Sequence, residues 1–527
     1  MQNRALARSL IAAAAVAATS LAASVVAPPA AAGQPPDPGV IRVDSGWLRG
    51  SVADDHVTYS AIPYAAPPVG ERRWRAPAPP RPWSGVRDAT EPSTRCPQGD
   101  PANLVGAEDC LYLDVTVPRD ARPGARLPVL VWLHGGGFNS GSAQEFDGAR
   151  LAVSGDLIVV TPNYRLGALG FLASSELEAG GGNYGLMDQA AVLRWVRRNA
   201  ARFGGDPGNV TLAGQSAGAR SVCAHLAAPM SRGLFHRAIS QSGACDNQVP
   251  TLAEAHEFGD RAAAELGCST ADDVAACLRQ RTPGQLLDTL DDVGWEVDGR
   301  VSDRPWNPVA GTPVLPRQPG EALRDGSAAR VPLLIGGTRD EMRGFVLREA
   351  GLTADGYRTM MTGTFGDEAD AVLAAYPAAD YDSPALALAA VLGDWGGSIG
   401  ACPVLRSAEA AAARQPVFAY EFAEDSGQAP GGYPLGSYHG LDLPYVWDLD
   451  LAQNPYPDLT AEQERMSETI IGYWSAFADT GDPNGAGRPH WPAFGTTGTV
   501  IELSTAGIAP TPFADDHRCD LWAGLPR

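Results

Sequence analysis

The 527-residue sequence contains no lysine, so all 40 of its basic residues are arginines. This absence excludes P-loop nucleotide hydrolases, protein kinases, Schiff-base enzymes and S-x-x-K serine hydrolases, because each of these classes depends on a lysine amine. The 61 acidic residues give the chain a formal net charge of −21. This negative charge disfavours nucleic acid as a partner and otherwise indicates only solubility.

The spacing typical of a metal site is also missing. No pair of cysteines has the two-residue spacing of a zinc site, and no histidine pair shares a helical face near a cysteine. The eight cysteines form an even set in an apparently exported chain, which favours disulfides. Three neighbouring pairs would close short loops, and one long-range bond would tie down the carboxyl terminus: Cys96 with Cys110, Cys223 with Cys245, Cys268 with Cys277, and Cys402 with Cys519.

The first 32 residues have the layout of a secretory signal. Two arginines precede an alanine-rich apolar run, and three alanines that end at Ala32 provide a small-residue cleavage site. We expect cleavage after Ala32, which would remove two positive charges and no acids, take the net charge from −21 to −23, and leave a secreted chain. The alternative is an uncleaved anchor, although the run is barely long enough to span a bilayer. No later run approaches that length, so we expect no stable membrane insertion.

Short, continuous apolar runs predict a parallel sheet that is covered on both faces. A helix with apolar residues at three- and four-residue steps separates the second run from the third, which indicates an α/β fold. Residues 250–330 and 345–410 are richer in helix formers, and we interpret them as helical insertions over the sheet edge. No repeat or clear linker is present, so residues 33–527 are predicted to form a single domain. The five predicted strands are Val129–Leu133, Leu157–Thr161, Val210–Ala213, Val331–Ile335 and Val417–Tyr420.

The stretch NVTLAGQSAGARSV, residues 209–222, places Ser216 between two glycines directly after an apolar run. The residues that follow favour a helix, so the stretch predicts a strand–turn–helix corner. A G-x-S-x-G corner holds its serine in a sharp turn with the hydroxyl exposed, and the glycines let other segments approach closely. Ser216 is therefore a candidate nucleophile; the alternative is a small residue in a tight turn.

A serine nucleophile needs a histidine base, a carboxylate that orients the base, and backbone amides that bind the oxyanion. In sheet hydrolases the chain order is serine, acid, histidine, which leaves His439, His490 and His517 as candidates. His490 lies between prolines in RPHWP, and His517 lies beside an expected disulfide. His439 lies in the glycine-bracketed loop GSYHGLDL and is the preferred base, with an ordinary surface histidine as the alternative.

The candidate acid follows the strand that ends at Ile335, in VPLLIGGTRDEM. This segment offers Asp340 and Glu341, and spacing alone does not choose between them. For the oxyanion, LHGGGFNSG places Gly135, Gly136 and Gly137 directly after a strand, where free N–H groups can act with the amide of Ala217. A phosphate-cradling loop is the competing interpretation, but it needs a helix start and usually a lysine that this stretch does not supply.

Taken together, these stretches resemble the type-B carboxylesterases, the α/β-hydrolase group that also contains the cholinesterases. The resemblance extends in order from about residue 40 to the last cysteine. It implies an α/β-hydrolase fold with a large, mostly parallel central sheet, helices on both faces and helical insertions that cap the active site. It also implies a small-molecule ester substrate. We expect no cofactor, and the spacing of cysteines and histidines disfavours a metal site. The matching stretches are AIPYAAPPVGERRW, AEDCLYLDVTVP, LHGGGFNSG, PNYRLGALGF, GNYGLMDQAAVLRWV, FGGDPGNVTLAGQSAGA, LFHRAISQSGA, LLIGGTRDEM, YHGLDLPYVW and WSAFADTGDPN.

The resemblance assigns roles that spacing leaves open. It favours Glu341 over Asp340 as the acid, with Ser216 as nucleophile and His439 as base. Ser242 matches a serine thought to steady the acid, with a buried structural hydroxyl as the alternative. The three oxyanion donors match Gly136, Gly137 and Ala217, and three of the expected disulfides match recurrent family bridges: Cys96–Cys110, Cys268–Cys277 and Cys402–Cys519.

Three departures from the family pattern concern the substrate site. Gln215 stands where glutamate commonly precedes the nucleophile, and Met342 stands where glycine usually follows the acid. The segment Pro97–Asp109 contains no tryptophan to hold a quaternary ammonium, so a cholinesterase is disfavoured. We therefore predict a general carboxylic ester hydrolase. The alternatives are a lipase for longer acyl chains and a non-catalytic binding or adhesion protein on the same fold.

Overall fold

A large mixed sheet is the central feature of the computed structural model, which describes residues 39–100, 102–177, 181–290, 304–396, 399–449, 456, 458–495 and 497–525. Within these residues the sheet has 13 strands in the order β1-β2-β3-β5-β8-β6-β9-β10-β11-β12-β14-β15, with β4 paired to β2. The strands are β1 (Val40–Val43), β2 (Gly46–Val52), β3 (His56–Pro63), β4 (Val86–Ala89), β5 (Tyr112–Pro118), β6 (Leu127–Leu133), β8 (Ile158–Pro162), β9 (Gly205–Gln215), β10 (Arg237–Gln241), β11 (Leu333–Thr338), β12 (Val417–Phe422), β14 (Val500–Ser504) and β15 (Gly507–Thr511).

The middle of the sheet is parallel, and its two edges are antiparallel. Strands β8, β6, β9, β10, β11, β12 and β14 pair in parallel, whereas β5 joins β8, and β15 joins β14, in the antiparallel direction. All five strands predicted from continuous apolar runs lie in this parallel part, as β6, β8, β9, β11 and β12. The prediction of an α/β fold with a mostly parallel central sheet is confirmed.

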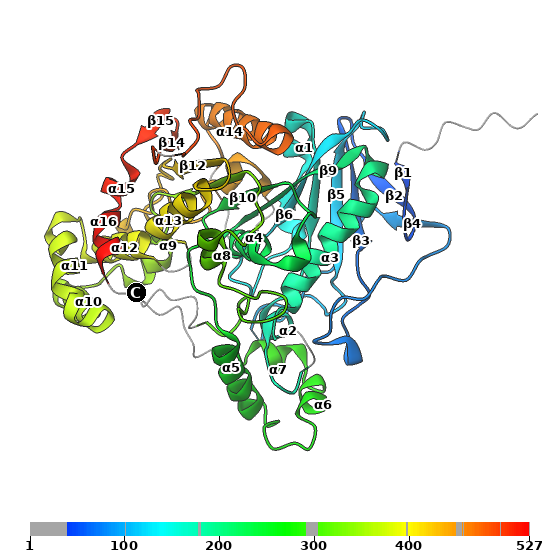
Figure 1. Cartoon of the computed structure of the whole chain (residues 1–527), viewed down its shortest axis with the longest axis horizontal. Coiled ribbons are helices and arrows are strands. Elements are labelled where there is room, and N and C mark those ends of the chain that lie inside the picture. Colours follow the sequence, from blue (N-terminus) through cyan, green and yellow to red (C-terminus); the bar gives the residue numbers. More distant parts are fainter. Residues whose placement is uncertain are drawn as a thin grey trace, which may run out of the picture. The chain divides into compact units, whose positions relative to one another are not determined.

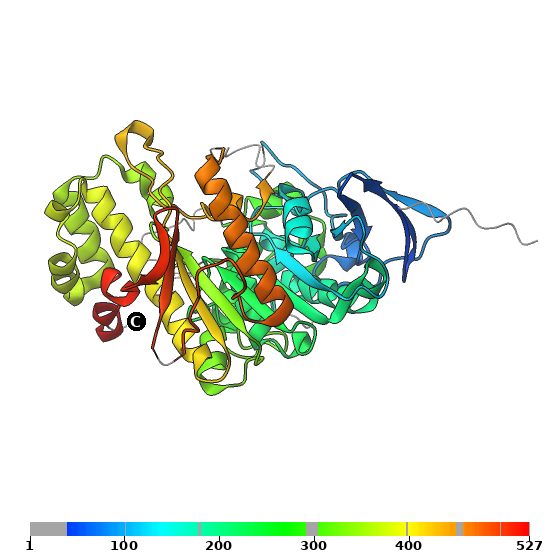
Figure 2. The same ribbon diagram turned by 90° about the horizontal axis from the view of Figure 1, so that it is seen from above.

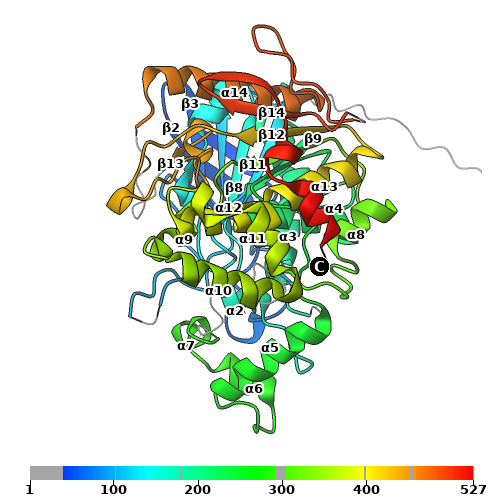
Figure 3. The same cartoon turned by 90° about the vertical axis from the view of Figure 1, so that its left-hand side faces the viewer.

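Helices cover both faces of the sheet. The predicted crossover helix is α3 (Tyr184–Asn199), which together with α4 (Ala217–Ala227) packs against β9 on one face. On the other face, α1 (Ala149–Gly155) and α14 (Ala461–Thr480) lie side by side (Figures 1 and 2). Figure 3, viewed along the sheet, shows α14 above the strands and α4 and α13 (Ala401–Ala412) below them.

Both regions predicted as helical insertions contain helices. Figure 1 shows α5, α6 and α7 grouped below the sheet and α10, α11 and α12 to its left. Helix α7 contacts the short helix α2 (Gly167–Phe171), which follows β8. The inserted helices are α5 (Leu252–Glu265), α6 (Val274–Arg279), α7 (Pro283–Leu287), α8 (Pro319–Asp325), α9 (Arg343–Val346), α10 (Ala354–Phe365), α11 (Ala369–Ala375) and α12 (Pro384–Trp395).

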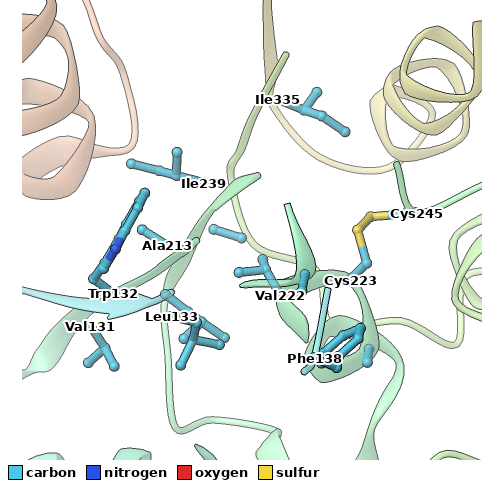
Figure 4. Packing of buried hydrophobic residues seen from close by; sticks show 14 of the residues in the cluster. Val131, Trp132, Leu133, Phe138, Ala213, Val222, Cys223, Ile239, Cys245 and Ile335 are labelled. Carbon is cyan, nitrogen blue, oxygen red and sulfur yellow. A yellow bond between two sulfur atoms is a disulfide. The ribbon is translucent and has the colours of Figure 1, made fainter. Parts of the chain in front are cut away.

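The core beneath the candidate site is continuous and closely packed. Trp132 and Leu133 of β6 and Ala213 of β9 are at most 1% exposed, and they lie beside Ile239 of β10 (Figure 4). Apolar side chains buried on both faces of these strands fix the ends of β6 and β9 in space. The candidate site residues at these strand ends therefore rest on a rigid support.

Four disulfides are present, in the pairing expected from the sequence. The Cys223–Cys245 bond, visible in Figure 4, ties α4 to the segment that follows β10. The Cys402–Cys519 bond joins α13 to α16 (Cys519–Gly524) across 117 residues of chain. The four bonds therefore include one that fastens the helix after Ser216.

The predicted signal, residues 1–32, lies outside the described residues, so its cleavage stays a prediction. The described residues belong to one compact unit that starts at Gly39. Among them, no helix is both long and apolar enough to cross a membrane.

Candidate active site

Ser216 lies at the corner between β9 and α4, with a backbone φ of +57° and ψ of −121°. Its N–H donates a hydrogen bond to the carbonyl of Gln241 at the end of β10, 2.9 Å away. A side chain at Gly218 would collide with the carbonyl oxygen of Leu133, and one at Gly214 would press against the Gly218 backbone. The two glycines are therefore required for the close approach of β6, β9 and α4, and the strained corner leaves Ser216 partly exposed.

His439 and Glu341 come together from segments 98 residues apart. The Nδ1 atom of His439 lies 2.5 Å from Oε2 of Glu341. The other carboxylate oxygen, Oε1, accepts a 2.8 Å hydrogen bond from the N–H of Thr338 at the end of β11. Glu341 is only 2% exposed, and the His439 side chain is 14% exposed. The buried carboxylate therefore holds the imidazole with the Nδ1 proton toward Glu341, which leaves Nε2 as the hydrogen-bond acceptor of the ring.

The neighbouring carboxylate, Asp340, has a different role in the structure. It pairs with Arg343 at 2.8 Å and accepts a 2.9 Å hydrogen bond from the N–H of Ser437. Its own N–H donates to the carbonyl of Ser437 at 3.0 Å. Asp340 thus pins the loop that carries His439, whereas Glu341 contacts the imidazole itself.

The two other histidine candidates lie elsewhere. His490 is exposed, in the segment after α14. His517 is buried between two carboxylates, with Nδ1 2.5 Å from Asp394 and Nε2 2.6 Å from Glu421. Both nitrogens of His517 are engaged, so it has no free nitrogen with which to accept a proton.

Gln215 makes a contact that sequence reasoning missed. Its side-chain amide nitrogen lies 3.2 Å from Nε2 of His439, the nitrogen that a catalytic base would turn toward the serine. Among the described residues, no hydrogen bond joins the Ser216 hydroxyl to His439. The His439 ring therefore rests against the residue that precedes Ser216. Catalytic hydrogen bonds are often absent or long before substrate binds.

The oxyanion candidates follow β6 and start α4. Gly136 and Gly137 have φ of +100° and +62°, in the left-handed region, and a side chain at Gly136 would collide with the carbonyl of Ser140. Within the described part of the chain, the amides of Gly136, Gly137 and Ala217 donate no hydrogen bond. Three unused donors near Ser216 are suited to a developing negative oxygen.

Ser242 lies near the acid without bonding to it. Its N–H donates to the carbonyl of Gly336 at 2.8 Å, and its φ is +52°. Its hydroxyl is buried and has no hydrogen-bond partner among the described residues. In this structure Ser242 therefore does not steady Glu341 through its hydroxyl.

Asp442 is a second buried carboxylate near the base that sequence reasoning missed. Its Oδ2 atom accepts hydrogen bonds from the Gln241 amide at 2.9 Å and from the Tyr420 hydroxyl at 3.3 Å. Burial raises the pKa of Asp442 to about 6, and the negative charge of Glu341 adds to that effect. The position of Asp442 three residues after His439 was the only signal in the sequence, and such an acid is more often surface charge.

The geometry can support acyl transfer. A serine on a strained corner, an imidazole oriented by a buried carboxylate, and unpaired amides beside them are the parts of a covalent mechanism. Among the described residues, no cluster of three or more histidines, cysteines or acids could hold a metal ion.

Comparisons with known proteins agree with this chemistry. The model described as "Carboxylesterase family" matches residues 37–522. Fumonisin B1 esterase of Sphingopyxis macrogoltabida is 36% identical over 494 residues, which cover 90% of this chain and 88% of the relative. Para-nitrobenzyl esterase of Bacillus subtilis (strain 168) is 35% identical over 473 residues, which cover 86% and 92%. A solved structure of a thermophilic PNB esterase is 33% identical with a TM-score of 0.79, and the match covers 91% of this chain and 99% of the other.

Proposed function

Because this chain belongs to the carboxylesterase family and is a carboxylic ester hydrolase, we propose that it cleaves its small-molecule ester through Ser216, His439 and Glu341. The observation that carries the proposal is the 2.5 Å contact between His439 and Glu341, next to a serine on a strained corner. Glu341 fixes the tautomer of the imidazole and stabilises the imidazolium that forms.

In the first half of the reaction, the Ser216 hydroxyl takes the place of the Gln215 amide at Nε2 of His439. His439 then accepts the hydroxyl proton while the oxygen attacks the ester carbonyl. The negative oxygen of the tetrahedral intermediate is bound by the amides of Gly136, Gly137 and Ala217. Collapse of the intermediate, with a proton from His439, releases the alcohol and leaves an acyl-enzyme.

In the second half, His439 activates a water molecule, which attacks the same carbonyl and releases the acid. Each oxyanion amide in such a site contributes about 3 kcal/mol to the lowering of the barrier. The donors are held in place by close backbone packing around Gly136 and Gly218, so little reorganisation is needed when charge develops.

We also propose that the chain is secreted. The support is the three-part layout of residues 1–32 and the four disulfides, since disulfides persist in oxidising compartments. Mass spectrometry of the chain from culture medium would test the expected start at Gly33.

A fluorophosphonate probe and Ser216→Ala test the catalytic proposal together. We expect covalent labelling of the wild type at Ser216, no labelling of Ser216→Ala, and a loss of at least about 10⁴-fold in turnover of p-nitrophenyl esters. Ser269→Ala, at an exposed serine between α5 and α6, is the matched control and should label like the wild type. Turnover by Ser216→Ala within about tenfold of the wild type would contradict the assignment.

The same esters separate the alternatives. A lipase would prefer long acyl chains and gain activity at an oil–water interface. A binding protein on this fold would neither be labelled by the fluorophosphonate nor hydrolyse the esters. Gln215 and the absence of tryptophan in Pro97–Asp109 support a general esterase over a cholinesterase.

A further inference from the structure

Arg220 lies directly behind the candidate oxyanion site. It is on α4, one helical turn after Ser216, and its N–H donates to the carbonyl of Ser216 at 2.9 Å. The carbon of its guanidinium is 4.6 Å from the centre of the Phe138 ring. Phe138 directly follows Gly137 in the chain, so the guanidinium lies between the helix that starts at the nucleophile and the loop that carries two oxyanion amides.

The Arg220 side chain is buried and has no carboxylate partner among the described residues. The residue is 5% exposed, and its Nη1 atom has no hydrogen bond within the described residues. Two other buried arginines are paired with carboxylates: Arg165 with Asp188 at 2.7 Å, and Arg73 with Glu108. A buried guanidinium without a carboxylate is energetically costly, and in proteins such charges are paired or bind a ligand.

The charged surroundings of Arg220 add to this cost. Burial, followed by the positive charge of Arg304, lowers the pKa of Arg220 to about 9. Among the described residues, no acidic side chain acts on it; the other interacting group is the neutral Tyr164 hydroxyl. Among the described residues, the positive charge of Arg220 therefore has no compensating acid beside the oxyanion loop, and it favours an anion there.

We propose that Arg220 forms an anion subsite beside the oxyanion loop, which selects esters that carry a free carboxylate, such as the monoester of a dicarboxylic acid. The inference rests on the proposed function and specifies its substrate class. The planar guanidinium of Arg220 offers parallel N–H donors that match a carboxylate. The free carboxylate is bound and unchanged in the reaction, while Ser216 attacks the ester carbonyl of the same molecule.

Monoethyl glutarate and diethyl glutarate test the subsite, because they share a carbon chain and differ in charge at pH 8. Initial rates by proton release give the ratio of kcat/KM for the anionic ester to that for the neutral ester. We expect Arg220→Met to lower this ratio by about tenfold or more relative to the wild type, as is typical when a charge-assisted hydrogen bond is lost. Arg220→Lys, which keeps the charge, should lower it less, and Arg202→Met, at an exposed arginine on the 3₁₀ turn after α3, should leave it unchanged.

A ratio that is the same in Arg220→Met and the wild type overturns the proposal, since a merely structural arginine would lower both rates together. Binding gives a readout that does not need catalysis. Glutarate should raise the Tm of Ser216→Ala and should not raise that of the Ser216→Ala, Arg220→Met double variant; equal shifts would overturn the subsite. If the wild type neither labels with fluorophosphonate nor cleaves either ester, the proposed mechanism fails, and the glutarate experiment still decides the subsite.

Discussion

Nδ1 of His439 lies 2.5 Å from Glu341, while Nε2 of the same ring faces the side chain of Gln215 at 3.2 Å. The imidazole is thus held from both sides, by the carboxylate of Glu341 and by the neutral amide of the residue that precedes Ser216. A carboxylate in place of that amide would act on the base directly. The two contacts lead to separate predictions, one about the reaction rate and one about its dependence on pH.

Glu341→Gln should keep the shape of the acid and lose its charge. The amide can no longer stabilise the imidazolium and can turn its NH₂ group toward Nδ1, which would favour the wrong tautomer. We expect kcat to fall by about 10³- to 10⁴-fold, measured with p-nitrophenyl acetate at pH 8. Asp340→Asn, at the adjacent carboxylate, should reduce kcat far less, because Asp340 contacts Arg343 and Ser437 instead of the imidazole. Equal losses in the two variants would contradict the assignment of the acid.

Gln215→Glu should move the acid limb of the pH–rate profile. A carboxylate about 3 Å from Nε2 favours the imidazolium, so the base would lose activity at a higher pH, by about one pH unit. The measurement is kcat/KM for a neutral ester from pH 5 to 9. Gln215→Ala is the control, since it removes the amide without adding charge. An acid limb that stays in place in Gln215→Glu would show that this side chain does not act on His439.

The parts of the fold that can be predicted are those determined by residues close together in the sequence. The five parallel strands were found because each is an apolar run buried on both faces. Strands at the antiparallel edge, such as β2, expose alternate residues, and β10 contains polar residues, so neither stands out in the sequence. The corner at Ser216 was also predictable, because the two glycines it requires are its sequence neighbours.

The rest of the site depends on contacts between distant segments. Asp340 and Glu341 follow the same strand, and only the position of His439, 98 residues later, separates their roles. Spacing could not reveal that the Gln215 amide reaches Nε2, or that Gln241 binds Asp442 across 201 residues. Each side chain can be identified from the sequence, but tertiary packing decides which buried groups face one another.

Asp442→Asn should raise the free energy of unfolding relative to that of the wild type, and this gain should be larger at neutral pH than at pH 4. Burial raises the pKa of Asp442 from 3.8 to about 6, so the stability it contributes is present below pH 3.8 and is lost as the pH rises through 6. Asparagine does not ionise and avoids that loss. We expect the difference in free energy of unfolding between variant and wild type to rise by about 3 kcal/mol between pH 4 and pH 7, measured by urea unfolding. Asp458→Asn, at an exposed aspartate, should show no such change with pH, and a flat difference in Asp442→Asn would refute the account.

His517 holds the carboxyl-terminal segment to the body by charge. Its ring lies between Asp394, near the end of α12, and Glu421 of β12, and it stands two residues before Cys519, which is bonded to Cys402. Despite burial, the two carboxylates raise the pKa of His517 to about 10. The imidazolium therefore stays charged at neutral pH and bridges two acids that would otherwise repel each other.

His517→Asn tests how much the charge of this imidazolium contributes to the free energy of unfolding. A raised pKa means that the stability is fully present below pH 6.5 and is lost as the pH rises through about 10. The variant leaves two buried carboxylates without their cation, so we expect its free energy of unfolding at pH 7 to fall by about 3 kcal/mol. The deficit relative to wild type should shrink toward pH 10.5, where the wild-type imidazole is also neutral. His490→Asn, at an exposed histidine, controls for the loss of an imidazole as such. A deficit that is the same at pH 7 and pH 10.5 would mean that His517 acts by packing, because only a charge effect disappears when the ring is deprotonated.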